Sequence, residues 1–581
     1  MKRNFVAVAM VAIAVFVMSE PAAARVRAAD TVLTNGHVYT VDRHHSVAQA
    51  IAIRNGKIVF VGSSRAARAY VGPATSVVDL GGKVVLPAFT DAHMHPTMGA
   101  LTGLYEIQFT NFFDPTIEEY LDTVADFVAA HPDLAGYRGG GWVNGVAPGI
   151  GPLASDLDAV CPDKPVILTS QDYHSVWVNS KTLELAGITA DTPDPANGKI
   201  ERLPDGTPSG TLRESAMDLV ATVIPDYTLA QYEEAIEYFQ RDVAAPVGLT
   251  QVLDAKMAPG STACAAFENL AKQGKLTMRV QGALELHPDE AIAPQIKMAI
   301  AERAKHTTPY FRTKSVKFFV DGVIEGHTGY LLKPYADAES YCGDAGYRGM
   351  ALWEQKALNA ASIAAAKAGF RLHYHAIGDA AVRMALNAIQ AAEKATGRNN
   401  MRPAITHLQL VSPKDMARFK SLHVVAVPQP YWHISDEYYW DIQLPYLGKD
   451  RADHEYPMRS FFNKGVLVAS ASDYPVTVPP DALMGIETGV LRWYQDYSYG
   501  AEVLWPEERC TIRQMIDSFT INGAKSLFTD KITGSVESGK SADLVVLSQN
   551  ILHIPPHFIG DNAYTKVEMT FFQGQRVYEV P

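Results

Sequence analysis

Two histidines separated by one residue, His93 and His95, are the first residues in this 581-residue sequence whose type and spacing indicate chemistry. They close the segment Asp-Ala-His-Met-His, which follows an apolar run that predicts a strand. Positions i and i+2 of a strand project to the same side, so both imidazoles can reach one ion. Imidazole is a common zinc ligand, and the pair therefore predicts a metal site.

Further polar residues lie near the C-terminal ends of other predicted strands. They are Lys317, His375, His407 and Asp473. The active sites of parallel barrels are built at those ends, whereas polar residues deep in the strands would lack partners. A divalent cation lowers the pKa of a bound water and polarises a carbonyl, and a nearby carboxylate can carry the proton. We predict one or two divalent ions, zinc first, held by His93, His95, Lys317, His375, His407 and Asp473, with Asp473 also catalytic.

Several neighbouring residues compete with this assignment. Lys317 binds a cation only after reaction with carbon dioxide, which turns its amine into a carboxylate; the alternative is a neutral or paired lysine beside Asp321. Glu214 is a rival carboxylate ligand. His373 shares a strand face with His375 but lies two residues deeper, and we interpret it as a core histidine rather than a ligand.

The elements that must position these residues alternate short apolar strands with helical stretches, which is typical of parallel α/β structure. Eight strands with intervening helices predict a (β/α)8 TIM barrel. The predicted strands are residues 84–93, 248–255, 278–286, 315–322, 371–379, 404–411, 423–430 and 466–475.

The segments outside the barrel predict two further units. Residues 31–85 and 535–581 read as strands with Asn-Gly and Gly turns, and we predict one composite β-sandwich formed by both chain ends. The barrel then occupies residues 86–534. A stretch at about 102–244, between the first two barrel strands, is expected to be an inserted α+β lobe.

The amino terminus and the overall charge predict location and partners. Lys2 and Arg3 precede an apolar run and a cluster of alanines, which predicts a signal peptide over residues 1–24, cleaved between Ala24 and Ala28. Its apolar core is shorter than the roughly 20 residues that a membrane-spanning helix needs, so we expect an exported periplasmic or extracellular protein without a permanent membrane span. The net charge of −12 argues against nucleic acid and favours a small neutral or cationic substrate. The scattered cysteines do not predict a disulfide framework.

Several sequence motifs together resemble a known family. They are His-x-His after Pro-Ala-Phe-Thr-Asp, then HAIGD, THLQL, SDYPV and SGKSADLVVL, with GGGWVNG and DGTPSGTLRE in the lobe. The chain resembles the amidohydrolase superfamily, and more narrowly its YtcJ-like amidohydrolase 3 branch, from about residue 31 to the C-terminus. GxSxG, Walker A, GxGxxG and CxxC motifs are absent from the sequence, so serine-hydrolase, nucleotide and redox chemistry are not supported.

The resemblance implies roles for the predicted ligands. His93, His95 and Asp473 would hold the more buried ion, and His375 and His407 the more exposed one. Asp473 would take a proton from the attacking water and deliver it to the leaving nitrogen. Related enzymes carry a carboxylated lysine at the end of the fourth strand, where Lys317 falls.

The resemblance also implies hydrolysis of a non-peptide C–N bond in a linear amide, N-acyl amine or formamide. Ester or cyclic-amide hydrolysis stays open, and so does a catalytically silent exported binding or regulatory protein on the same scaffold. We expect the lobe to cover the barrel mouth. The expected substrate contacts are Trp142, His174, Asn179, Glu214 and His327, although Glu325, Gly326 and His327 depart from the branch's usual small polar residues.

Overall fold

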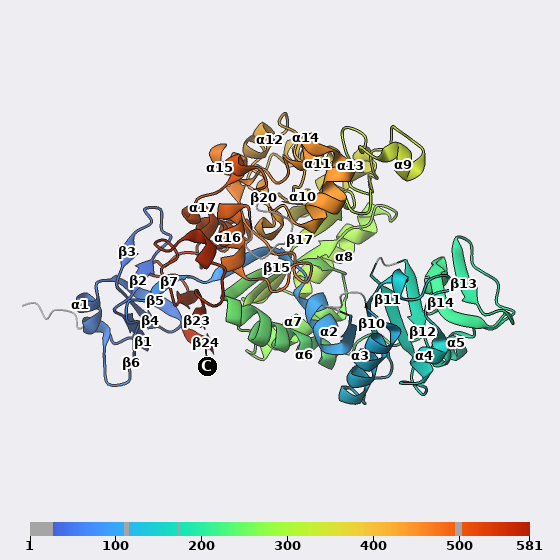
Figure 1. Cartoon of the computed structure of the whole chain (residues 1–581). Helices are drawn as coiled ribbons and strands as arrows, with labels where there is room; N and C mark the ends of the chain where they lie inside the picture. Colours follow the sequence, from blue (N-terminus) through green and yellow to red (C-terminus); the bar gives the residue numbers. More distant parts are fainter. Residues whose placement is uncertain (1–26, 110–114, 172–173, 494–501, 581) are drawn as a thin grey trace, which may run out of the picture.

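The structure is a computed structural model that describes residues 27–580 except 110–114, 172–173 and 494–501 (Figure 1). The predicted signal peptide lies outside the described residues. None of the helices formed by the described residues is both long enough and apolar enough to cross a membrane.

The centre of the molecule is an eight-stranded parallel sheet whose strand order follows the chain. Each strand coincides with one of the eight predicted segments, so the barrel prediction is confirmed. Backbone bonds join the two ends of the sheet, since the Ala92 amide donates to the Ser470 carbonyl at 3.1 Å. The strands are β8 (Phe89–Met94), β15 (Leu249–Met257), β16 (Arg279–Glu285), β17 (Phe311–Phe319), β18 (Arg371–Ala376), β19 (Ala404–His407), β20 (Val425–Val427) and β21 (Leu467–Val468).

Helices on the outside of the barrel bury one apolar face each. In α11, Val382, Leu386 and Ile389 recur at helical spacing and are all buried. This helix packs against its neighbour α10 and against β18. The helices between and after the barrel strands include α7 (Thr262–Lys272), α8 (Ile292–Lys305), α10 (Gln355–Lys367), α11 (Asp379–Thr396), α12 (Met416–Ser421), α15 (Met458–Asn463), α16 (Ala482–Leu491), α17 (Ile512–Phe519) and α18 (Ile521–Ser526).

Both chain ends contribute to the β-structure beside the barrel, as predicted. A six-stranded sheet pairs β7 of the N-terminal segment antiparallel with β22 of the C-terminal segment. A four-stranded sheet lies against it, and Leu33, Ile51, Val85 and Leu544 share the core between them. The first sheet contains β2 (His37–Tyr39), β3 (Val47–Ala48), β7 (Val84–Pro87), β22 (Leu544–Leu547), β23 (Val567–Phe572) and β24 (Gln575–Glu579), and the second β1 (Thr31–Thr34), β4 (Ala50–Arg54), β5 (Lys57–Gly62) and β6 (Ser76–Asp79).

The inserted lobe is a mixed six-stranded sheet flanked by helices, and it stands to one side of the barrel (Figure 1). The chain enters it through α2 (Pro96–Tyr105) and leaves through α6 (Leu229–Tyr238), which packs against α2. The other lobe elements are β9 (Glu106–Gln108), α3 (Ile117–Ala130), β10 (Tyr137–Trp142), α4 (Ala154–Asp158), β11 (Val166–Ser170), β12 (Ser175–Val178), α5 (Ser180–Ala186), β13 (Gly198–Arg202) and β14 (Pro208–Glu214).

The glycine run before Trp142 serves strand packing in this lobe. A Cβ at Gly139 would lie 2.0 Å from the Ile107 carbonyl oxygen, and one at Gly140 would lie 2.2 Å from that of Thr169. Residues with side chains are therefore excluded where β10 passes between β9 and β11.

Candidate metal centre

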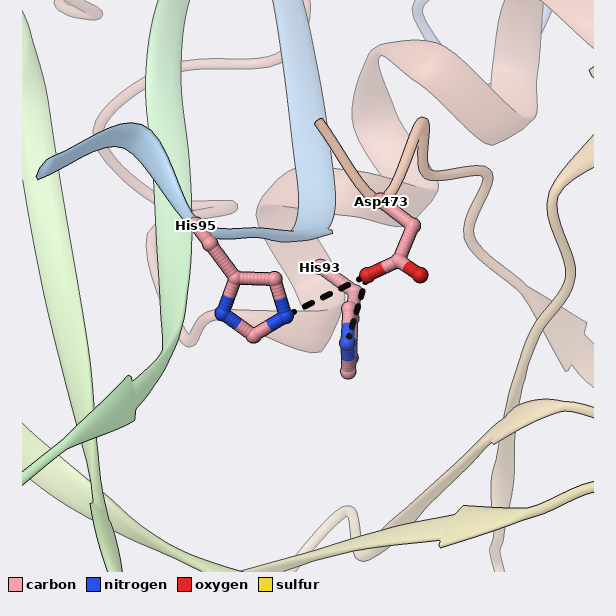
Figure 2. A group of neighbouring side chains, drawn as sticks. All are labelled: His93, His95 and Asp473. Atoms are coloured by element: carbon pink, nitrogen blue, oxygen red, sulfur yellow. Dashed lines mark ion pairs between the residues drawn. The ribbon is translucent and has the colours of Figure 1, made fainter. Parts of the chain in front are cut away.

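Three side chains from the two edges of the barrel sheet converge at its rim (Figure 2). His93 lies in β8 and His95 directly after it, whereas Asp473 follows β21. The Nε2 atoms of His93 and His95 lie 3.2 and 3.3 Å from Asp473 Oδ1. This oxygen is buried and has no hydrogen-bond partner. Two imidazole nitrogens and an unpartnered carboxylate oxygen around one point form a donor set that fits a divalent cation.

A buried aspartate and the backbone hold these ligands in place. The Asp91 carboxylate accepts hydrogen bonds from the amides of His93 (3.0 Å) and Ser472 (2.9 Å), so it ties β8 to the segment that carries Asp473. The Asp473 amide donates to the His93 carbonyl at 3.0 Å. The relative position of the two segments is therefore set by hydrogen bonds before any ion binds.

The other three predicted ligands lie beside this group. The His407 ring centroid is 5.0 Å from that of His93 and 4.5 Å from that of His375. Lys317 Nζ lies 3.4 Å from His93 Nε2. Among the described residues, however, only His93, His95 and Asp473 form a group whose ligand atoms all lie within 4.8 Å of one another. The structure thus brings all six residues together, and the ligand atoms of His93, His95 and Asp473 lie closest to one another.

Hydrogen bonds orient the two histidines on the other side of the centre. His407 Nδ1 lies 3.2 Å from Gln429 Oε1, which can only accept, so this nitrogen donates and Nε2 keeps its lone pair. His375 Nε2 donates in the same way to the Gly322 carbonyl at 3.0 Å, which leaves Nδ1 as the electron-pair donor. The sequence analysis did not single out Gln429, and the only signal for it is its place after the seventh barrel strand.

Burial sets the charge of the predicted ligands. It lowers the pKa of His93 and His407 well below the ordinary range and that of His375 to about 4, with neighbouring positive charge adding to the effect. Burial opposes ionisation of Asp473, but its contacts with the surrounding imidazoles, that of His95 first, and with Lys317 still hold its pKa below the ordinary value. The centre therefore offers neutral imidazoles and an ionised carboxylate near neutral pH, as metal binding requires.

His373 supports the first ligand rather than joining the centre. It is fully buried, and its Nε2 lies 2.6 Å from His93 Nδ1, on the far side of the His93 ring from Asp473. This placement agrees with the interpretation of His373 as a core histidine. It also supplies His93 with the second contact that fixes the ring of a metal-binding histidine.

Three of the expected substrate contacts serve packing instead. Trp142 is fully buried in the hydrophobic core of the lobe, where its indole N–H donates to the Leu168 carbonyl. Asn179 caps α5, and its amide nitrogen donates to carbonyls within the lobe. His327 pairs with Asp337 at 2.9 Å and stacks on Tyr341. The expectation for these three is therefore corrected, because their polar atoms and ring faces are already occupied.

The remaining pair stays a prediction as a substrate contact. His174 Nδ1 lies 3.1 Å from Glu214 Oε1, and the two side chains are 66% and 58% exposed. Glu214 does not belong to the group of candidate metal ligands that the described residues form, so it does not replace Asp473 or Lys317 as a ligand there.

The fold and the site together define a class of protein: a (β/α)8 barrel with a candidate His-His-Asp metal site at the C-terminal rim of its strands. Comparison with known proteins identifies the family, because the sequence profile of the Amidohydrolase family matches residues 76–578. The chain belongs to this family, and it is a metal-dependent hydrolase of the amidohydrolase superfamily.

Relatives and solved structures cover most of the chain. It is 29% identical over 553 residues to a putative amidohydrolase YtcJ of Bacillus subtilis (strain 168), covering 94% of this chain and 98% of the relative. It is 28% identical over 539 residues to an N-substituted formamide deformylase of Arthrobacter pascens, covering 90% and 94%. The crystal structure of an uncharacterized metal-dependent hydrolase from Pyrococcus furiosus shares the fold, with a TM-score of 0.71, 24% identity, and coverage of 90% of this chain and 99% of that one.

Proposed function

We propose that the protein hydrolyses a non-peptide C–N bond of a small linear amide, such as an N-acyl amine or a formamide, with one or two divalent ions, zinc first. The observation that carries the proposal is the unpartnered, buried Asp473 Oδ1 between His93 Nε2 and His95 Nε2. Similarity to a protein named N-substituted formamide deformylase supports the choice of C–N bond.

Different residues of the chain bind metal and transfer the proton during hydrolysis. His93, His95 and Asp473 would hold one ion, and His375, His407 and a carboxylated Lys317 a second. A bound divalent ion polarises the substrate carbonyl and makes a nearby water more acidic. Asp473, ionised near neutral pH, takes the proton of the attacking water and then delivers it to the leaving nitrogen.

Lys317 is expected to act as a carbamate. Burial lowers the pKa of its amine to about 7, which provides the neutral nucleophile that carbon dioxide requires. A Lys317→Ala variant should lose part of its metal and about 100-fold or more in kcat, as removal of a second ion's ligand reduces charge stabilisation. Short carboxylic acids such as acetate should restore part of both. Unchanged metal content and kcat would exclude Lys317 as a ligand.

A substrate panel tests the proposed function itself. The holoenzyme should hydrolyse N-acyl amines or formamides faster than matched esters and cyclic amides, and chelation should abolish the reaction until metal is returned. Metal analysis should give one to two equivalents. Faster hydrolysis of esters or cyclic amides would show that those compounds are the preferred substrates. Hydrolysis of none of the compounds would favour the binding or regulatory alternative.

We also propose that the protein works outside the cytoplasm, which rests on the charged, apolar and alanine-rich pattern of residues 1–24. Its partners in this proposal are small-molecule substrates.

A further inference from the structure

Three acidic side chains form a cluster on loops at the rim of the barrel; we call Glu325, Asp436 and Glu455 the acidic cluster. Glu455 is fully buried, and burial raises its pKa well above the ordinary range, with the charges of Asp436 and Glu325 adding to the effect. The loops that carry the three residues share one hydrophobic core, formed by Ile324, Leu410, Tyr439 and Tyr456 among others.

Glu325, one member of the acidic cluster, lies on the loop that orients His375. This loop follows β17, and its Gly322 carbonyl accepts the hydrogen bond from His375 Nε2. Glu325 lies three residues further along the same loop. Surrounding protein raises the pKa of the Glu325 carboxyl although the residue remains exposed to solvent. Glu325 is therefore carried by the loop segment that also contacts the metal centre through His375.

The other two members are connected to His407. Gln409, two residues after His407, donates to Glu455 Oε1 at 2.6 Å. Trp432 stacks on the His407 ring at a centroid distance of 5.6 Å, and Asp436 follows it by four residues. All three carboxyl groups thus belong to segments that also hold or contact the two histidines.

The acidic cluster has a positive neighbour but, among the described residues, no ion pair, because the charge of Arg492 lowers the pKa of Glu455 without a contact between the two charged groups. In the described part of the chain, no lysine, arginine or histidine forms an ion pair with Glu325, Asp436 or Glu455. Arg492 is near Glu455, but its guanidinium donates to the backbone carbonyls of Glu455 and Tyr456 at 2.9 and 3.0 Å. Glu455 Oε2 has no hydrogen-bond partner at all.

Further unpartnered polar atoms occur at the same place. His433 is fully buried and stacks on Tyr456 at a centroid distance of 4.8 Å, yet neither of its ring nitrogens has a hydrogen-bond partner. Trp440 Nε1 is buried and also unpartnered. Buried polar atoms without partners are rare in folded proteins, so several together indicate a missing polar ligand.

The group missing from the acidic cluster is not a metal ion. Among the described residues, only His93, His95 and Asp473 bring three potential metal-binding atoms within 4.8 Å of one another. The carboxyl groups of the acidic cluster are therefore too widely spaced to share one small ion. Their aromatic surroundings suit a larger organic cation, and Tyr438, 51% exposed, offers an additional ring face.

We propose that the acidic cluster binds a cationic group of the substrate, an ammonium or a guanidinium carried several bonds from the scissile amide. The inference rests on the proposed function, since it identifies the substrate class of the same site. A bound cation would give Glu455 Oε2 its missing partner and favour the ionised carboxylate. The cluster then selects N-acyl amines whose amine portion carries a second, positively charged group.

Two amides of equal length test this inference. N-acetylcadaverine carries an ammonium where N-hexylacetamide carries a methyl group. We expect kcat/KM of the holoenzyme to be about 10- to 100-fold higher for N-acetylcadaverine, the range for one hydrogen-bonded charge. The ratio should fall to within about threefold of unity in Glu325→Gln and Glu455→Gln, because an amide retains the shape but not the charge.

A matched variant controls for the general charge of the rim. Glu339→Gln removes an exposed carboxylate from the short helix α9 (Ala338–Cys342), outside the acidic cluster, and should keep the ratio of the parent. Because Glu455 is buried, Glu325→Gln provides the second variant on an exposed side chain. Equal loss of the ratio in Glu339→Gln would overturn the specific role of the cluster.

Binding measurements separate failure of this inference from failure of the proposed function. Calorimetry on metal-loaded Asp473→Asn protein compares the two amides directly. Tighter binding of N-acetylcadaverine that is lost in Asp473→Asn/Glu325→Gln supports the cation site even if no amide is hydrolysed by the parent. Equal or absent binding of the two compounds overturns it. Hydrolysis of both amides at equal rates would leave amide hydrolysis standing and overturn the cation site.

Discussion

The Asp473→Asn variant is expected to keep most of its metal and to lose about 100- to 10,000-fold in kcat, the usual range when a proton-transfer group is removed. Asparagine has the same shape, and its carbonyl oxygen can still occupy the position of Oδ1 between His93 and His95. It cannot accept a proton from the attacking water. Single-turnover and steady-state rates, with metal content measured on the same samples, check this expectation.

A second Asp→Asn change in the same region serves as the control. Asp481 is also buried, but its carboxylate caps the start of α16 by accepting from the Leu483 amide at 2.9 Å. Asparagine is an equally good helix cap, so Asp481→Asn should leave kcat and stability close to the parent. A kcat of Asp473→Asn within about threefold of the parent would show that another group is the base.

The barrel could be predicted from the sequence because its signals are local. Short apolar strands, each followed by a helical stretch, are recognisable without knowledge of the packing, and all eight were found in their observed order. The ligand positions follow from the same pattern, since parallel strands bring their C-terminal ends to one rim. His93 and Asp473 meet although they are far apart in the chain, because β8 and β21 are the two edges that close the sheet.

The inserted lobe shows where the sequence was insufficient. Trp142 and Asn179 lie in motifs that resemble functional segments, yet they fill the lobe core and cap α5. Whether a tryptophan or an asparagine faces a ligand or its own domain depends on tertiary packing, which no local spacing encodes. The expectation that Trp142 and Asn179 contact the substrate is corrected for this reason.

The contacts around the ligands could not be predicted from the sequence. Asp91 accepts from the amide of His93, Gln429 accepts from His407, and His373, predicted only as a core histidine, contacts the His93 ring from another strand. The acidic cluster likewise joins three loops that only the closed barrel brings together. Such contacts decide ligand orientation and substrate preference, and they depend on side-chain geometry rather than on residue periodicity.

A variant with His93→Ala and His95→Ala is expected to lose the ion that these two residues hold with Asp473, and with it all measurable hydrolysis. The two imidazoles supply two of the three converging ligand atoms, which leaves Asp473 as a single ligand in the group. One carboxylate does not hold a divalent ion against dilution, so dialysed protein should contain about one equivalent less than the dialysed parent, whereas loss of one supporting contact costs only about 10- to 100-fold in affinity. Metal analysis after dialysis measures this.

A control variant at another buried histidine distinguishes the loss of metal ligands from damage to the fold. His306 is buried and pairs with Glu302 at 2.8 Å and with Glu268 at 2.5 Å, outside the metal centre. Removal of this imidazole leaves two largely buried carboxyl groups without this partner, which costs about 1–3 kcal/mol, so His306→Ala should lower the melting temperature yet retain its metal. The double variant should show the reverse pattern, metal loss with circular dichroism like that of the metal-free parent. Full metal content in the double variant would place the ion elsewhere and remove the basis for assigning catalysis to Asp473.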